Sequence, residues 1–99
     1  MLKGTTIKYD GLPEGLQESM RLYMEAGISG GGFLDAVLQN DLLLAVIRAD
    51  NTNLEALPDI VKWIHWEAPK VSYGSRETVL AWIDGFKPIE DRRYLNDGV

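Results

Sequence analysis

The chain has 99 residues, of which 45% are hydrophobic and 25% charged, as is usual for one small globular domain. Its 10 basic and 15 acidic residues are mixed along the chain and give a net charge of −5, so the basic stripe of a direct nucleic-acid binder is missing. The sequence has no cysteine, which excludes disulfides and thiolate sites, and no apolar run near the ~18 residues of a membrane span. We therefore expect a soluble, cytoplasmic protein that does not bind membranes.

Residues 1–11 lack helical periodicity and are predicted to form a short extended arm, in which Thr5–Tyr9 has the composition of a lone strand. Pro13 suits a first helical turn, where its missing N–H is not needed, and Gly27 suits a helix C-cap. Apolar residues recur between them at helical spacing, at Leu16, Met20, Tyr23 and Met24. A first helix is predicted from about Pro13 to Ala26.

A glycine loop follows, with four glycines within the six positions 27–32. It lacks a preceding strand and a following lysine, so it matches neither a dinucleotide-binding nor a P-loop motif. One interpretation is an anion or phosphate pocket, in which Gly30, Gly31, Gly32 and Phe33 offer backbone N–H groups at a helix start. The other, which we favour, is a tight connection between closely packed helices, with Phe33 filling the core.

The second helix begins near Gly32 or Phe33, and the cap residues Asn40-Asp41 make Leu42–Ala49 either a separate helix or a kinked continuation. The segment Leu42–Ile47 is apolar on all sides, which indicates burial within the core or at a subunit interface. The candidate interface residues are Leu43, Leu44 and Ile47.

Asp50–Asn53 is predicted to be a turn leading into a helix over Leu54–Glu67. The expected inward face of this helix consists of Leu57, Ile60, Val61 and Ile64. Pro58 removes one backbone hydrogen bond and disfavours helical geometry in the residue before it, so we expect the helix to start late or to kink there. Pro69 is expected to end it.

Ser75 is a predicted N-cap for a last helix over about Arg76–Gly85, and Pro88 closes that segment. Its expected core face consists of Val79, Leu80, Trp82 and Ile83. The predicted architecture is therefore all-α: a compact bundle of four or five short helices over residues 12–87, preceded by the arm and followed by a tail at 88–99.

Aromatic residues are a second set of candidate ligand-binding or interface residues. Trp63 and Trp66 share one side of their helix, so one of them is expected to be partly exposed, as a stacking wall for a ring-bearing ligand or as an interface residue. Tyr73 precedes a helix N-terminus where Ser75 and Arg76 offer polar groups to an anion. If this N-terminus and the glycine loop face one pocket, they have the groups that a nucleotide-type ligand needs.

No catalytic, metal or cofactor site is predicted. His65 is the only histidine and has no partner of metal-binding or catalytic spacing. The serines lack a nucleophile-elbow motif. We therefore predict a protein that is not an enzyme and needs no cofactor.

Several spaced motifs of the chain are distinctive: I-S-G-G-G-F-L-D-A-V-L-Q-N-D-L within residues 12–42, R-A-D-N-T-N-L at 48–54, W-E-A-P at 66–69 and Y-G-S-R-E-T-V-L-A-W-I at 73–83. With these motifs the sequence resembles a family of small phage and prophage proteins without an assigned activity. Family members often have I-P-P-G-G-F in the loop, are more polar at Leu43 and Leu44, and lack Pro58. The softer loop weakens the case for a rigid ligand pocket, whereas the apolar pair favours an interface.

These observations predict a non-enzymatic phage-type binding protein that acts on a host system. The leading version is a sponge for a nucleotide-type signalling molecule, and thus an anti-defence protein. The alternative is a protein-interaction module that inhibits or redirects a host protein through an aromatic or apolar helix surface. A homo-oligomer is possible in either case.

Overall fold

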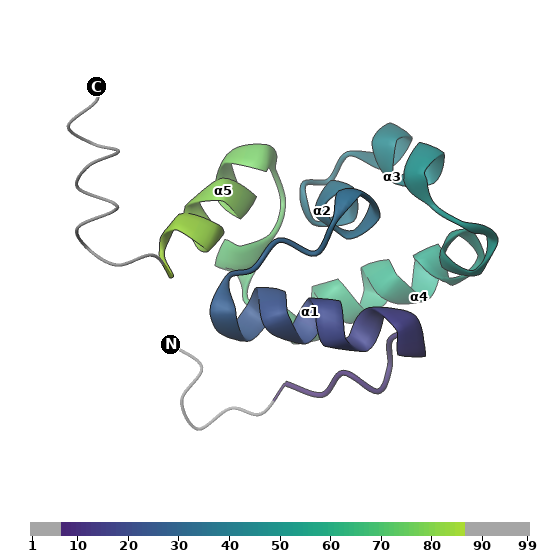
Figure 1. Ribbon diagram of the computed structural model, residues 1–99, viewed down its shortest axis with the longest axis horizontal. Coiled ribbons are helices and arrows are strands. Elements are labelled where there is room, and N and C mark those ends of the chain that lie inside the picture. Colours follow the sequence, from purple (N-terminus) through teal and green to yellow (C-terminus); the bar gives the residue numbers. More distant parts are fainter. Residues whose placement is uncertain (1–6, 87–99) are drawn as a thin grey trace.

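The computed structural model describes residues 7–86, which form a small all-α bundle (Figure 1). The α-helices in this range are α1 (Glu14–Ala26), α2 (Gly32–Leu38), α3 (Leu42–Arg48), α4 (Asn51–Glu67) and α5 (Arg76–Asp84), and a short 3-10 helix, η1 (Lys70–Ser72), precedes the last. In Figure 1, α1 and α4 run along the lower side, and α2 lies between α3 and α5, with contacts to both. The predicted fold class is confirmed.

Helix α1 forms as the sequence predicts. Pro13 precedes it as N-cap residue, and Gly27 ends it with a left-handed backbone (φ 67°) whose N–H bonds to carbonyls of the last turn. The four apolar positions of the predicted stripe are all buried: Leu16, Met20, Tyr23 and Met24. This helix therefore supplies one wall of the core.

Helices α2 and α3 are separate and pack against each other. Asn40 takes a positive φ of 63°, which breaks the helix, and the Asp41 carboxylate then accepts the Leu44 N–H at 3.1 Å and caps α3. The kinked-continuation alternative is therefore wrong. The two short helices form a hairpin that leaves one face of α3 away from the core.

Helix α4 begins earlier than predicted. The Asp50 carboxylate accepts the Asn53 N–H at 2.7 Å, so the expected turn residues form the first turn of the helix, and Pro58 lies in the helix interior. Ile60, Trp63 and Ile64 are buried, whereas Val61, an expected core residue, is half-exposed. The stabilisation from the N-cap and from this buried face is larger than the cost of the hydrogen bond that Pro58 removes.

Helix α5 starts at the predicted N-cap, because the Ser75 hydroxyl accepts the Thr78 N–H at 3.1 Å. Val79 is fully buried, and Trp82 and Ile83 pack against the core. Leu80 is half-exposed, so its assignment to the core face was wrong. A short helix packed along a single side leaves the opposite side to solvent.

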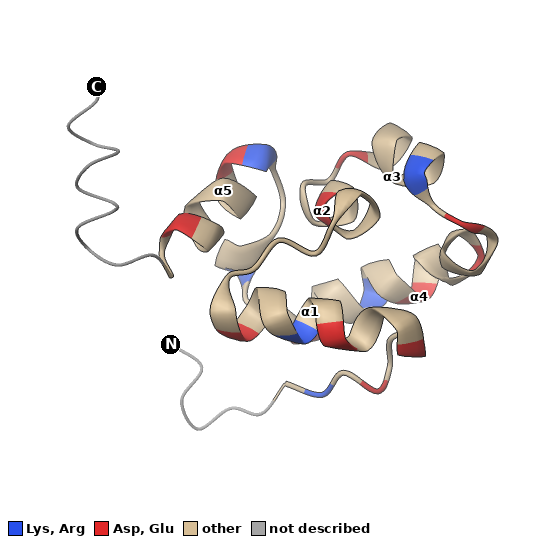
Figure 2. Cartoon of the chain, in the orientation of Figure 1, with Lys and Arg blue, Asp and Glu red and all other residues tan. Residues whose placement is uncertain are grey.

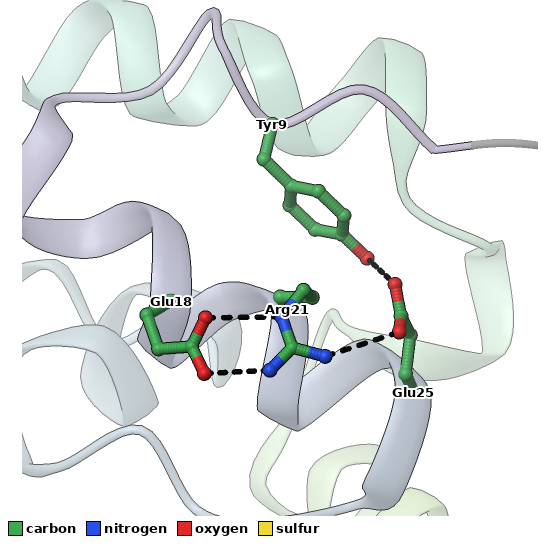
Figure 3. A network of polar contacts seen from close by, with 4 residues as sticks. All are labelled: Tyr9, Glu18, Arg21 and Glu25. Carbon is green, nitrogen blue, oxygen red and sulfur yellow. Dashed lines mark hydrogen bonds and ion pairs between the residues drawn. The ribbon is translucent and has the colours of Figure 1, made fainter.

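The described part of the N-terminal arm is extended and packs on the helices without forming a strand. The Trp63 indole N–H donates to the Lys8 carbonyl at 2.7 Å, and the Tyr9 ring stacks on Trp63 with ring centroids 5.6 Å apart. The Tyr9 hydroxyl also donates to Glu25, which joins it to the Glu18–Arg21–Glu25 ion pairs of α1 (Figure 3). Residues 1–6, the last residue of the predicted helical domain (87) and the predicted tail at 88–99 lie outside the described range.

Candidate functional site

The most unusual feature of the described surface is the solvent-facing side of α3. Leu42, Leu43 and Ile47 are 65%, 78% and 77% exposed, and Val46 is 42% exposed. Ala45 is buried and Leu44 is partly buried against the core. The expectation that this segment is buried within the core is therefore wrong, because α3 packs only through its Ala45 side.

The apolar surface continues onto α4. Leu54 and Val61 are 44% and 51% exposed and lie two helical turns apart on the same side of α4. A shallow pocket of about 50 Å³ joins the two helices, and its lining is Val37, Asn40, Asp41, Leu42, Ala45, Leu57 and Val61. We call this region the α3–α4 surface, defined by Leu42, Leu43, Val46, Ile47, Leu54 and Val61. Two of its members, Leu43 and Ile47, were predicted as interface residues.

Charge lies at the ends of α3 rather than along it. Asp41 precedes the helix and Arg48 ends it, with no charged residue between them (Figure 2). An exposed apolar helix face with charged residues at its ends is typical of sites that bind other proteins.

The glycine loop is held together by its own hydrogen bonds. The Asp35 carboxylate, in the first turn of α2, accepts the Gly30 N–H at 3.0 Å and the Ser29 hydroxyl, and Ser29 in turn accepts the Gly31 N–H at 3.4 Å. Two of the N–H groups that the anion interpretation needs are therefore used within the loop. A carboxylate also lies where a phosphate would have to approach, which disfavours an anion there.

Close packing accounts for Gly30 and backbone conformation for Gly31, whereas Gly32 contacts the flexible Arg48 side chain. A Cβ on Gly30 would lie 2.5 Å from the Leu34 side chain, and one on Gly32 would lie 2.6 Å from the Arg48 guanidinium. Gly31 takes φ 95°, which favours glycine. Phe33 is buried in the core, as the packing alternative predicts.

The two predicted helix N-termini are at opposite ends of α2. The Gly74 N–H, just before α5, donates to the Leu38 carbonyl at 2.8 Å, at the last residue of α2, whereas the glycine loop precedes the first. Seven residues of helix span about 10 Å, so this separation prevents the loop and the α5 N-terminus from cradling one phosphate group together. The Ser75 hydroxyl caps α5 with Thr78, and Arg76 is exposed.

Of the three aromatic residues predicted to contact a ligand or a partner, only one is largely exposed. Trp63 is 6% exposed and covered by Tyr9, so it cannot serve as an accessible stacking or interface residue, and that prediction was wrong. Tyr73 is partly buried against the core. Trp66 is 77% exposed, with its ring edge-on to His65, which confirms that one tryptophan of the pair is accessible.

Two tyrosines have raised pKa values for structural reasons. Burial, followed by the nearby Glu25 carboxylate, raises the pKa of Tyr9 to about 12. Burial raises the pKa of Tyr23 further, and the Asp35 charge adds to this. The Tyr23 hydroxyl donates to the Ser72 carbonyl at 2.7 Å, so both phenols act as structural donors.

Four residues of this surface were not predicted as site residues: Leu42, Val46, Leu54 and Val61, the last of which was expected in the core. Helical periodicity cannot tell which side of a uniformly apolar segment faces solvent, and only the position of Ala45 against α2 settles it. Among residues 7–86, no group of three or more acidic or histidine side chains could hold a metal ion. In the same range, no helix has the length and apolar character needed to cross a membrane.

No family model, no curated protein and no solved structure matches the chain. The geometry described above is therefore the basis for proposing a function.

Proposed function

We propose that this protein is a non-enzymatic protein-interaction module whose binding site is the α3–α4 surface. The observation that carries the proposal is the exposure of six aliphatic side chains on α3 and α4, at 42% to 78% each, two of which, Leu42 and Val61, line one pocket. A pocket of about 50 Å³ has room for the tip of one apolar side chain, as in the anchor site of a protein interface.

The energy available at this surface supports weak binding. Full burial of an aliphatic side chain contributes about 1.5–3 kcal/mol, so covering these partly exposed residues contributes on the order of 5–10 kcal/mol. Association itself costs about 4–15 kcal/mol. We therefore expect weak, reversible binding, of the kind found in transient regulatory complexes rather than permanent ones.

The biological setting is proposed from the sequence resemblance alone. We propose that the protein is a phage or prophage product in the cytoplasm of a bacterial host, where it inhibits or redirects a host protein. Trp66 adds an exposed aromatic residue on α4 that a partner can contact.

A capture experiment tests the proposal. Tagged wild-type protein is incubated with bacterial lysate beside Leu43→Glu, and Leu80→Glu serves as the matched control, because Leu80 is a half-exposed leucine on α5. We expect wild type and Leu80→Glu to retain the same host protein and Leu43→Glu to lose it. A protein captured equally by all three variants would contradict the α3–α4 surface as the site.

The nucleotide sponge stays a second proposal with a narrower basis. In its favour, the Arg48 side chain lies against Gly32, which brings a cation to the glycine loop. Against it, the Asp35 carboxylate already accepts hydrogen bonds from the Ser29 hydroxyl and the Gly30 N–H of the loop. A thermal-shift panel of cyclic and linear nucleotides tests it, because a ligand that binds the native state raises Tm, and an unchanged Tm throughout refutes it.

A further inference from the structure

The N-terminal arm, residues 7–12, is attached to the helices by side-chain contacts. The Trp63 indole N–H of α4 donates to the Lys8 carbonyl at 2.7 Å. The Tyr9 ring stacks on Trp63, and the Tyr9 hydroxyl donates to Glu25 of α1 at 3.2 Å (Figure 3). The contacts of the arm with α1 and α4 are therefore centred on two aromatic rings.

The backbone of the arm is independent of the helices. Among the described residues, no backbone–backbone hydrogen bond joins positions 7–11 to a helix, and the one within the arm is local, from the Leu12 N–H to the Tyr9 carbonyl at 3.0 Å. Leu12 is 4% exposed and belongs to the core. The exposed turn residues Asp10 and Gly11 are therefore the point at which the arm leaves the core, and Gly11 gives this turn the backbone freedom of a hinge.

The packing of α1 against the rest of the bundle does not depend on the arm. The Tyr23 hydroxyl donates to the Ser72 carbonyl at 2.7 Å, and the Trp82 indole N–H donates to the Tyr23 carbonyl at 2.9 Å. These bonds connect α1 to η1 and α5, and Tyr23 is fully buried. Release of the arm leaves both bonds in place, so the arm can open without unfolding of the bundle.

The residue that the arm covers is Trp63. It is 6% exposed, whereas Trp66, one turn further along the same side of α4, is 77% exposed. When the arm lifts away, the Trp63 ring and its indole N–H lose their partners and become accessible to solvent beside Trp66. The position of the arm therefore decides whether α4 presents one tryptophan or two.

We propose that the arm is a strap that opens and closes on the folded bundle as a unit, hinged at Asp10 and Gly11, and that Trp63 is accessible to solvent only in the open state. The closed state predominates, because it buries the Trp63 ring and satisfies its indole N–H. The strap is separate from the α3–α4 surface, because Trp63 and Val61 are two residues apart and thus about 200° apart around the helix. The inference does not depend on the proposed function.

Hydrogen exchange of the tryptophan indole N–H groups, followed by NMR in the full chain, tests the strap. One chemical group reports on three places: Trp66 is exposed, Trp63 lies under the arm, and Trp82 is bonded to a carbonyl of α1. We expect Trp63 to exchange at least about tenfold more slowly than Trp66, because the closed arm protects it. Low urea concentrations should leave the Trp63 rate nearly unchanged but speed exchange of the backbone amide of the fully buried Met20, which requires global unfolding.

Two matched variants test whether the arm is what protects Trp63. Tyr9→Ala removes the ring stacked on Trp63, and Phe86→Ala removes the ring packed edge-on to Trp82, with ring centroids 5.3 Å apart. We expect Tyr9→Ala to speed exchange of Trp63 at least about tenfold and to leave Trp82 unchanged, and Phe86→Ala to leave Trp63 unchanged. Tyr9→Phe loses only the hydroxyl bond to Glu25 and should have a smaller effect than Tyr9→Ala.

Several results would overturn the inference. If urea speeds exchange of Trp63 in parallel with Met20, the arm opens only when the whole bundle unfolds. If Trp63 exchanges as fast as Trp66, the arm does not cover it in solution. If Tyr9→Ala speeds Trp63 and Trp82 equally, speeds neither, or loses its helix content by circular dichroism, the arm is not a separate unit that controls Trp63. These results do not involve capture of a host protein, so they leave the proposed function standing.

Discussion

Replacement of Asp35 by alanine tests whether the glycine loop is a structural connection. The Asp35 carboxylate accepts the Gly30 N–H at 3.0 Å and the Ser29 hydroxyl, and it lies in the first turn of α2, where the helix dipole favours a negative charge. Asp35→Ala removes all three interactions. We expect the loop to lose its fixed conformation and the free energy of unfolding to fall.

The size of this effect follows from the separate interactions. Hydrogen bonds to a charged group contribute about 1.5–3 kcal/mol when buried and less when partly exposed, as here, so about 1 kcal/mol is assigned to each. The helix dipole adds about 0.3–1 kcal/mol. The expected total is about 2–3 kcal/mol, which for a domain of this size corresponds to a Tm lowered by about 10–20 °C.

Thermal unfolding followed by circular dichroism measures the change, and Asp59→Ala is the matched control because Asp59 is exposed on α4. The control should stay within about 0.5 kcal/mol of wild type. Asp35→Asn, which keeps an acceptor but loses the charge, should fall between the two. If Asp35→Ala unfolds like the control, the loop is not held by this carboxylate, and its hydrogen bonds to Ser29 and Gly30 do not stabilise the fold.

Three further predictions concern the arm and α4. Trp63→Phe loses the indole hydrogen bond to the Lys8 carbonyl and some buried volume, so urea unfolding should show a loss of about 1–3 kcal/mol. Because the folded-state pKa of Tyr9 is raised from 10.0 to about 12, its contribution to stability is complete below pH 10 and is lost as the pH rises through 12. An absorbance titration of wild type compared with Tyr9→Phe should show one tyrosine with this raised pKa. Glu25→Gln should lower the pKa of Tyr9, because the nearby carboxylate charge is removed. A Tyr9 that titrates at its ordinary value would contradict the packing of the arm on the helices. Pro58→Ala restores a helix N–H that can donate a backbone hydrogen bond. The change also raises the conformational entropy of the unfolded chain, which offsets part of this gain, so we expect the free energy of unfolding to rise by about 1–2 kcal/mol. A lower Tm would show that Pro58 does not destabilise α4.

Local signals in the sequence predicted most of the fold. The apolar stripe of α1, the αL glycine at Gly27, and the cap residues Asp41 and Ser75 each depend on neighbours within one or two helical turns. Such short-range interactions can be recognised without knowing the tertiary structure. The helix order and most helix ends therefore followed from the residues alone.

The errors concern features that only tertiary packing decides. Pro58 was expected to delay α4 or to kink it. The late start is wrong, because the Asp50 cap and the buried Ile60 and Trp63 keep the helix continuous through Pro58. Trp63 and Trp66 are equivalent by periodicity, and the arm decides between them by covering Trp63.

The candidate site was predicted only in part for the same reason. An all-apolar α3 is compatible with a buried helix and with an exposed interface helix, and its pattern cannot separate the two. Leu44 is turned partly toward the core, and Leu43 and Ile47 point outward. The nucleotide hypothesis required two helix N-termini in one pocket, which depends on tertiary packing. The Gly74–Leu38 hydrogen bond instead holds the start of α5 at the C-terminal end of α2, away from the glycine loop.

Methyl NMR spectra of the wild-type chain test the α3–α4 surface most directly. Spectra are recorded during addition of a captured host protein. We expect the methyl resonances of Leu43, Ile47 and Val61 to shift or broaden, because these side chains become covered, and those of the exposed Val71 and Leu80 to stay unchanged. Resonances of all five that stay fixed during this addition, or that change only at Val71 and Leu80, would contradict the assignment of this surface as the binding site.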